Sequence, residues 1–194
     1  VSRGFPLLYA DVFESLDDTG KRDINNKVNE IIQIISGRQI SDGGFSYWSG
    51  DNYSSDWVTT YAGHFLIEAK NRGYSVPESI ISRWVQFQKN KAQNWTLSNP
   101  SQGYYSISML DLQQSYRLYT LALSGNTELG AMNRLKEIKE LSIQSRWRLA
   151  ATYVIAGKPD IANALVFNID DVVEDYSFNN DSYGSATRDK AMIM

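Results

Sequence analysis

The chain has 194 residues, a net charge of −3 and a hydrophobic content of 42%, which are ordinary values for a globular protein with a sizeable core. It contains no basic run, so it lacks the electrostatic footprint of a nucleic-acid-binding protein, and no apolar run is long enough to span a bilayer. It has no Cys and one His, which excludes disulfides, thiolate catalysis and zinc sites built from Cys and His within the chain.

Apolar residues recur with helical spacing along nearly the whole chain. The clearest stripe, at i, i+4, i+7, i+8 and i+11, consists of Ile24, Val28, Ile31, Ile32 and Ile35. Another begins after Pro77, a residue suited to a first helical turn, and contains Ile80, Ile81, Trp84, Val85 and Gln88. No stretch alternates with the period of a strand. The sequence therefore predicts an all-α chain, with helices near residues 3–16, 22–37, 55–72, 77–92, 106–124, 127–140, 142–156, 158–166 and 184–194.

Three glycines, Gly73, Gly125 and Gly157, each follow a predicted helix and precede a short turn and another helix. Two of these stops lie 32 residues apart, a spacing that also suits a helical solenoid. The long irregular segments at residues 38–54 and 93–105 fit a strict solenoid badly. A toroid of helical hairpins, with inner and outer helices, accommodates them better, and we expect residues 1–194 to form a single domain of this kind.

The side chains that could carry chemistry have structural interpretations. His64 lies inside a predicted helix, and we expect its ring to be buried and to bind no metal. Asp17-Asp18 is typical of a helix end and turn, and Asp42, before two glycines, of a turn. Residues 168–171 (NIDD) resemble the acid motif of class II terpene cyclases, but a helix N-cap at Asp170 explains them at least as well. We therefore expect no catalytic residue, no metal and no cofactor.

Aromatic residues are abundant and gather in or beside the predicted loops, at residues 45–48, 104–105 and 176–178. Such residues could line a groove for a sugar or another apolar ligand. They could also fill the spaces where loops meet helix ends, which is the commoner role, or anchor a protein partner.

Four stretches, in this order, resemble bacterial alpha-2-macroglobulins. Residues 2–9 (SRGFPLLY) are similar to the segment just after the thioester motif Cys-x-Glu-Gln. Residues 39–48 (QISDGGFSYW) resemble a turn that this family shares with protein prenyltransferases and triterpene cyclases, and residues 56–62 (DWVTTYA) resemble the helix that follows it. Residues 183–192 (YGSATRDKAM) are similar to a later signature of the bacterial members.

The resemblance implies an alpha/alpha toroid of helical hairpins, as in terpenoid cyclases and protein prenyltransferases, and a trap rather than an enzyme. In the family, a Cys and a Gln form a buried thioester that acylates a Lys of the attacking protease. This chain has no Cys, so the Cys and Gln of the motif would either lie just before Val1 or be absent from this protein, as they are from some bacterial members. The residues that would flank the thioester are Ser2, Arg3, Phe5, Pro6 and Tyr9. Those that could shield or contact it are Tyr104 and Tyr105.

The implied function is part of a bacterial alpha-2-macroglobulin-like endopeptidase inhibitor. Its partners would be target proteases, met through the full-length protein, and other domains of the same parent chain. Residues 98–108 contain no His of the kind that directs complement relatives to hydroxyl groups, so amines would be the targets. The parent would be secreted to the periplasm or cell envelope, where only a lipid anchor elsewhere in it would meet the membrane.

Two alternatives stay open. One is a toroid enzyme of the terpene cyclase or polysaccharide-active type, which two facing carboxylates in a deep pocket would support. A prenyltransferase is disfavoured because its zinc site needs a Cys. The other is a helical scaffold for protein interactions, which strict stacking at a constant period would support. The helix near 184–194 has no cap and ends apolar, so we expect an incomplete toroid whose first and last helices leave apolar side chains exposed.

Overall fold

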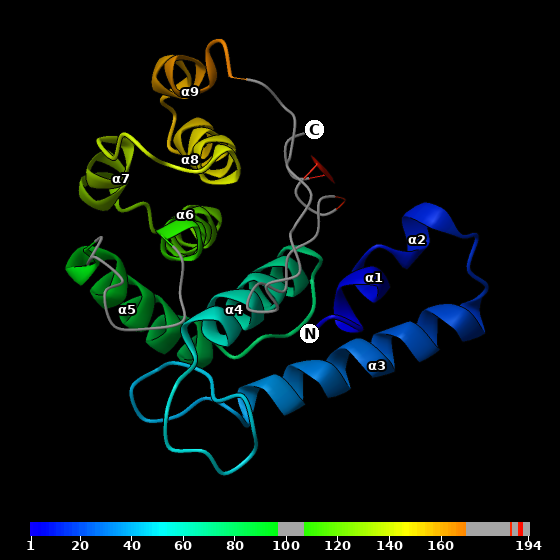
Figure 1. Ribbon diagram of the computed structural model, residues 1–194. Coiled ribbons are helices and arrows are strands. Elements are labelled where there is room, and N and C mark those ends of the chain that lie inside the picture. Colours follow the sequence, from blue (N-terminus) through cyan, green and yellow to red (C-terminus); the bar gives the residue numbers. More distant parts are fainter. Residues whose placement is uncertain (97–106, 170–186, 188–189, 192–194) are drawn as a thin grey trace. The chain divides into compact units, whose positions relative to one another are not determined.

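The computed structural model describes residues 1–96, 107–169, 187, 190 and 191, and the chain divides into two compact units, Val1–Gln88 and Lys89–Met194 (Figure 1). Within the described residues the secondary structure is helical, apart from an isolated bridge between Gln39 and Phe45. The helices are α1 (Gly4–Leu8), α2 (Ala10–Phe13), α3 (Asp18–Ser36), α4 (Asp56–Asn71), α5 (Glu78–Asn94), α6 (Ile107–Leu123), α7 (Leu129–Lys136), α8 (Ile143–Ile155) and α9 (Pro159–Val166). The predicted all-α class is confirmed.

The prediction of one helix over residues 3–16 is wrong, because the chain forms two short helices that meet at Tyr9. Helix α1 packs closely on α4. Gly4 is buried, and a Cβ built there would lie 2.6 Å from the ring of Phe65. Helix α2 buries no residue and leaves Val12 and Phe13 exposed, as expected for the first helix. We call residues 1–16 the N-terminal segment.

The prediction of a helix end and turn at Asp17-Asp18 is also wrong, because α3 begins there. The Asp17 carboxylate accepts a hydrogen bond of 2.7 Å from the N–H of Gly20, which satisfies one of the free donors of the first turn. From the predicted stripe, Val28, Ile32 and Ile35 are buried. Three of its five residues therefore form the core face of this helix.

Asp17→Ala is expected to lower the free energy of unfolding by about 1 kcal/mol, because it removes this cap. Urea denaturation followed by circular dichroism measures the change. The matched control is Asp23→Ala, an exposed position inside the same helix, where alanine should stabilise by a few tenths of a kcal/mol. Equal effects of the two substitutions would contradict the assignment of Asp17 as the cap.

Helix α4 lies at the core of the first unit, and eight of its 16 residues are buried. It meets α5 at Gly63, where a built Cβ would lie 2.1 Å from the indole of Trp84. The Trp84 indole N–H donates to the backbone oxygen of Thr59 at 2.8 Å, and the Gln88 side-chain amide donates to the hydroxyl of Thr60 at 2.9 Å. Gln88, which sequence spacing placed on the apolar face, is therefore buried with a polar partner.

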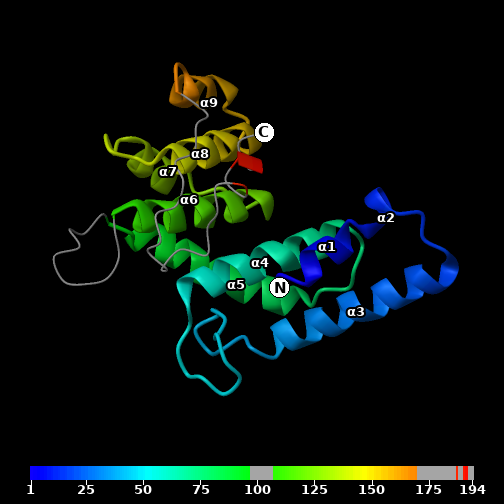
Figure 2. The same ribbon diagram turned by 45° about the vertical axis from the view of Figure 1, so that its right-hand side comes forward.

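In the second unit, α6 packs along α8 and α8 packs along α9, while α7 flanks α6 and α8. Figures 1 and 2 show α6, α8 and α9 stacked one on the next. Alternate helices α6 and α8 are therefore direct neighbours, as a layered arrangement of helical hairpins requires. The N-terminus of α8 is held by Asp111 of α6, whose carboxylate accepts from the N–H of Ser142 at 2.7 Å and from its hydroxyl at 3.2 Å.

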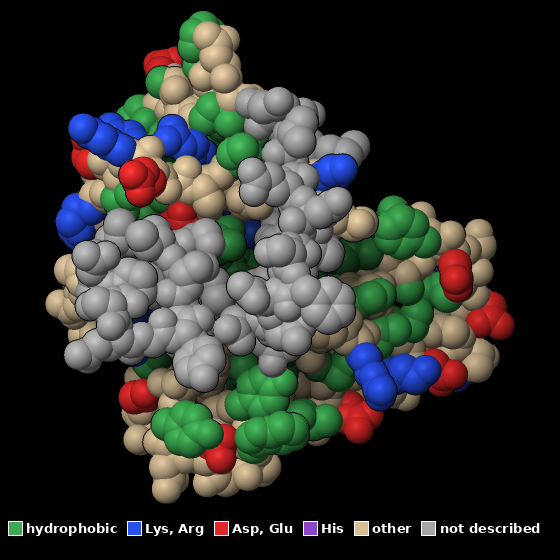
Figure 3. All heavy atoms as spheres, in the orientation of Figure 1, with side chains coloured by type: hydrophobic (Ala, Val, Ile, Leu, Met, Phe, Trp, Pro, Cys, Tyr) green, Lys and Arg blue, Asp and Glu red, His purple; other side chains and the backbone are tan. Residues whose placement is uncertain are grey.

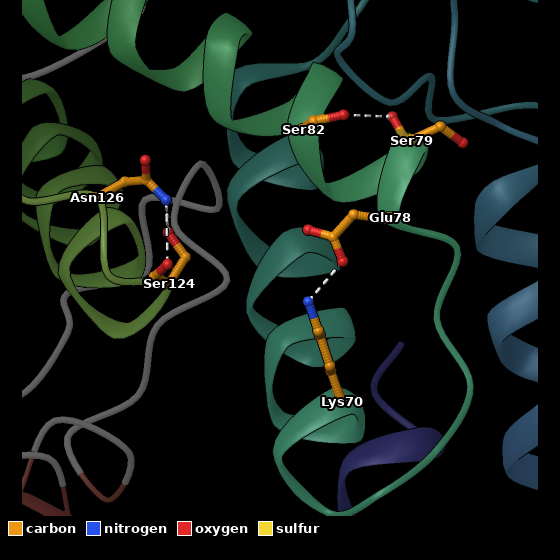
Figure 4. A network of polar contacts seen from close by, with 6 residues as sticks. All are labelled: Lys70, Glu78, Ser79, Ser82, Ser124 and Asn126. Atoms are coloured by element: carbon orange, nitrogen blue, oxygen red, sulfur yellow. Dashed lines mark hydrogen bonds and ion pairs between the residues drawn. The ribbon is translucent and has the colours of Figure 1, made fainter.

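The predicted glycine stops are confirmed. Gly73, Gly125 and Gly157 have φ values of +87°, +75° and +70°, which L residues other than glycine rarely adopt. After Gly125, the N–H of Asn126 donates to the oxygen of Leu121 at 2.8 Å, which closes the end of α6. Figure 4 shows the Asn126 side chain also donating back to Ser124.

The predicted helix over residues 184–194 lies mostly outside the described residues, although Thr187, Lys190 and Ala191 are helical. The predicted helix over 127–140 is shorter than expected and ends at Lys136. The single domain and the incomplete ring stay predictions.

Candidate functional site

The N-terminal segment meets α4 through a cluster of four rings. The ring of Phe5 stacks on that of Tyr61 with centroids 5.4 Å apart and an interplanar angle of 19°. It meets His64 and Phe65 edge-on, at 5.1 and 5.6 Å. Stacked and edge-to-face pairs of this kind stabilise beyond their buried area. Phe5 therefore anchors α1 on one face of α4.

Nearer the C-terminal end of α4, the same face of the helix makes polar contacts with the N-terminal segment. The hydroxyl of Tyr9 donates a hydrogen bond of 2.7 Å to Oε2 of Glu68, and Nε2 of His64 lies 3.9 Å from Oε1 of the same carboxylate. Burial and the hydrogen bond to Glu68 raise the pKa of Tyr9 above its usual value. The hydroxyl therefore keeps the proton that it donates. The His64 side chain is 20% exposed, so the predicted burial holds for most of it.

Arg72, just after α4, completes the contact. Its guanidinium carbon lies 4.2 Å from the centre of the Tyr9 ring, and Nη1 lies 3.3 Å from Oδ1 of Asp11. A cation over an aromatic face is attracted by the negative charge of that face. The side chains of Tyr9, Asp11, Glu68 and Arg72 thus link the N-terminal segment to α4 by charge and hydrogen bonding as well as by packing.

The predicted flanking residues separate into two groups. Phe5 and Tyr9 are partly buried where they contact α4, whereas Ser2, Arg3 and Pro6 are exposed. Ser2 accepts a hydrogen bond of 3.4 Å from the Tyr61 hydroxyl. Tyr104 and Tyr105 lie outside the described residues. The role of all seven beside a thioester stays a prediction.

Sequence reasoning missed Glu68 and Arg72. The one signal available for Glu68 is its position four residues after His64, on the same face of a largely apolar helix. Its partner Tyr9 is 59 residues away along the chain, so no local pattern pairs the two.

The turn at residues 39–48 is structural. Asp42 accepts from the N–H of Gly44 at 2.8 Å and from the hydroxyl of Ser54 at 2.9 Å, as predicted for a turn residue. Gly43 has a φ of +92°, and a Cβ there would lie 2.4 Å from the backbone oxygen of Arg83. The side-chain amide of Gln39 bridges Gly43 and α5 through their backbone oxygens. These residues fix the loop between α3 and α4 on the helices beside it.

Aromatic side chains cover the outer surface of the same loop. Trp48 and Tyr53 are each 65% exposed, and Tyr47 meets Trp48 edge-on at 5.0 Å. Hydrophobic side chains gather over this loop in the lower part of Figure 3. Part of the aromatic content therefore faces solvent, as a protein contact would require, and does not fill a gap between helices.

The described residues hold no group of three His, Asp or Glu side chains that could bind a metal. The same part of the chain contains no helix with the length and hydropathy of a membrane span. The candidate acid residues Asp170 and Asp171 fall outside it.

No family model matches the chain. Among curated proteins, an alpha-2-macroglobulin homolog of Yersinia pestis is 25% identical over 174 residues, which is 86% of this chain and 8% of that protein. The alpha-2-macroglobulin of Escherichia coli is 30% identical over 144 residues, or 69% of this chain and 8% of that protein. The chain thus spans less than a tenth of the length of these relatives.

Solved structures share the fold over nearly the whole chain. The native conformation of E. coli alpha-2-macroglobulin matches 98% of this chain and 12% of its own, with a TM-score of 0.77 and 24% identity. Salmonella alpha-2-macroglobulin reacted with methylamine matches 96% of this chain and 12% of its own, at 0.76 and 24%. The trypsin-activated E. coli protein matches 97% of this chain and 13% of its own, at 0.75 and 25%. The chain belongs to the bacterial alpha-2-macroglobulin family.

Proposed function

We propose that this chain is part of the thioester domain of a bacterial alpha-2-macroglobulin-like protease trap, and that it has no turnover activity of its own. The observation that carries the proposal is the shared fold with the E. coli and Salmonella proteins over 96% or more of the chain. The order of the four sequence stretches, from residues 2–9 to residues 183–192, supports the same placement.

The family context supplies the reaction. One similar structure was obtained after reaction with methylamine and another after activation by trypsin, which an amine-reactive group released by proteolysis would explain. In the parent of this chain, a Lys amine of the attacking protease would attack the thioester carbonyl of the Gln side chain. An amide forms, the carbon–sulfur bond breaks, and the Cys leaves as a thiol. The electrophile is consumed once, so the protein is a trap.

The N-terminal segment is the part of the chain that would lie next to the thioester. By resemblance, the thioester precedes Val1, and Phe5 and Tyr9 attach the residues that follow it to α4. We further propose that the parent is a lipid-anchored protein of the periplasm or cell envelope. Other domains of the parent would supply the bait for proteases.

The test uses the full-length parent protein with trypsin or elastase. We expect a covalent protease complex that survives denaturing electrophoresis, and thiol released in an amount equal to the methylamine incorporated. Treatment with methylamine beforehand should abolish the covalent complex, because the electrophile is already consumed. The matched control is trypsin inactivated at its active site, which cannot cleave the bait and should form no complex.

An absence of both thiol release and covalent capture would overturn the proposed thioester chemistry. Turnover of an isoprenoid diphosphate or a polysaccharide by the same protein would favour the enzyme alternative.

A further inference from the structure

The N-terminal segment is held on α4 at few points. Helix α2 has no buried residue, and α1 has two, Gly4 and Leu8. The other described anchors are the ring of Phe5, the hydroxyl of Tyr9, the Asp11–Arg72 ion pair and the Tyr61–Ser2 hydrogen bond, and α1 also packs on α3. With so little buried apolar surface, each polar contact carries a large share of the attachment.

Glu68 is the centre of the polar contacts. Its two carboxylate oxygens face different neighbours: Oε2 accepts from Tyr9, and Oε1 lies near Nε2 of His64. Its side chain is 19% exposed, so the hydrogen bond from Tyr9 is partly shielded from water. Hydrogen bonds to a charged acceptor are stronger than those between neutral groups. At 2.7 Å the Tyr9–Glu68 bond is shorter than the Tyr61–Ser2 hydrogen bond, at 3.4 Å, and the Asp11–Arg72 ion pair, at 3.3 Å.

Other side chains at this contact hold Tyr9 and Glu68 in place for their hydrogen bond. Arg72 lies over the Tyr9 ring and pairs with Asp11 on α2. The ring of Phe5 lies edge-on to that of His64, with centroids 5.1 Å apart, beside Glu68. Residues from both sides of the contact thus fix the geometry of one hydrogen bond.

We infer that Glu68 is a positioning residue: through Tyr9 it holds the N-terminal segment on α4, and loss of this hold raises the reactivity of the adjoining thioester toward amines. The second half rests on the proposed function, since it needs a thioester before Val1. The first half concerns residues 1–16 alone. Loosening the segment would expose the electrophile to solvent and to amines without any protease.

The experiment measures the attachment of residues 1–16 and the reactivity of the thioester. It uses the full-length parent protein in the variants Tyr9→Phe, Glu68→Leu and their combination. Hydrogen–deuterium exchange of the amides of residues 1–16 should rise about tenfold in each single variant, the factor expected for loss of one hydrogen bond to a charged group. The double variant should show no further rise, because either change removes the same bond. Methylamine-dependent thiol release should accelerate in parallel, with the global unfolding midpoint nearly unchanged.

Two further variants separate positioning from general damage. Glu68→Gln keeps an oxygen that accepts from Tyr9, so it should retain most of the protection. Glu78→Gln removes a carboxylate from the exposed ion pair between Lys70 on α4 and Glu78 on α5, at 2.6 Å, which includes neither Tyr9 nor Glu68 (Figure 4). This control should leave both exchange and thiol release as in the parent sequence.

Unchanged exchange in Tyr9→Phe and Glu68→Leu would overturn the inference that Glu68 holds the segment. Faster exchange with unchanged thiol release would overturn its link to the thioester. A parent that releases no thiol under any condition would overturn the proposed function instead, while the exchange data would still decide whether Glu68 positions the segment.

Discussion

Gly63→Ala is expected to lower the free energy of unfolding by about 3 kcal/mol, the upper end of the cost of overpacking a core. A Cβ at this position would lie 2.1 Å from atoms of the Trp84 ring, which is fully buried and fixed by its hydrogen bond to Thr59. The indole cannot move aside without breaking that bond, so the α4–α5 crossing must open. The gain in helix propensity from Gly to Ala, about 1 kcal/mol, offsets only part of this cost.

The matched control is Gly130→Ala in α7. That glycine is also inside a helix, but a Cβ there would have as its nearest neighbour the end of the flexible Arg134 side chain, at 3.8 Å. It should stabilise the protein by up to about 1 kcal/mol. In urea denaturation, Gly63→Ala should also cost less in a Trp84→Leu background than alone. A cost equal in both backgrounds would contradict the assigned clash.

Asp111→Ala is expected to lower the free energy of unfolding by about 2 kcal/mol at neutral pH. The carboxylate is buried, and its removal leaves the N–H and the hydroxyl of Ser142 without this acceptor at the start of α8. Removing a desolvated charge returns some stability, so the loss should stay below the full cost of an unsatisfied buried group. Urea denaturation at pH 7 measures it.

The same carboxylate makes stability depend on pH. Burial raises the pKa of Asp111 above its usual value of 3.8, against the opposing hydrogen bonds from Ser142 and Ser145. At any pH between the pKa of Asp111 in the unfolded chain and its higher pKa in the folded chain, the folded chain binds more protons than the unfolded chain. The Asp111 carboxyl therefore makes its full contribution to the free energy of unfolding below pH 3.8. This contribution is lost as the pH rises through the pKa of the folded chain.

Comparison with Asp111→Asn isolates this contribution, because asparagine does not titrate. The free energy of unfolding of the parent sequence, less that of the variant, should fall as the pH rises from about 4 and then level off. A difference that rises over the same range would show that the hydrogen bonds outweigh burial and that the folded pKa lies below its usual value.

The sequence predicted features that depend on neighbours along the helix. The stripe with Val28 and Ile32, and the stops at Gly73, Gly125 and Gly157, arise from spacing or from backbone conformation, and both leave local patterns. The break at Tyr9 and the cap at Asp17 were missed. The close approach of Gly4 to Phe65 also leaves no local pattern, because it joins residues far apart in sequence.

The candidate site shows the same limit. Phe5 and Tyr9 were identified by resemblance, and the periodicity of α4 gave the helix that they contact. Glu68 was not identified, because an acidic residue on a helix is usually a solvated one. Only the fold brings the Tyr9 hydroxyl within 2.7 Å of it.

The contrast between two tryptophans of the first unit gives this protein an optical reporter of its own. Trp84 is fully buried at the helix crossing, whereas Trp48 is 65% exposed on the loop between α3 and α4. In a variant that keeps only these two of the five tryptophans, acrylamide should therefore quench the fluorescence of Trp48 and leave that of Trp84 almost unchanged. A protease or neighbouring domain that covers the loop would protect Trp48, and the steady emission of Trp84 would serve as the internal reference.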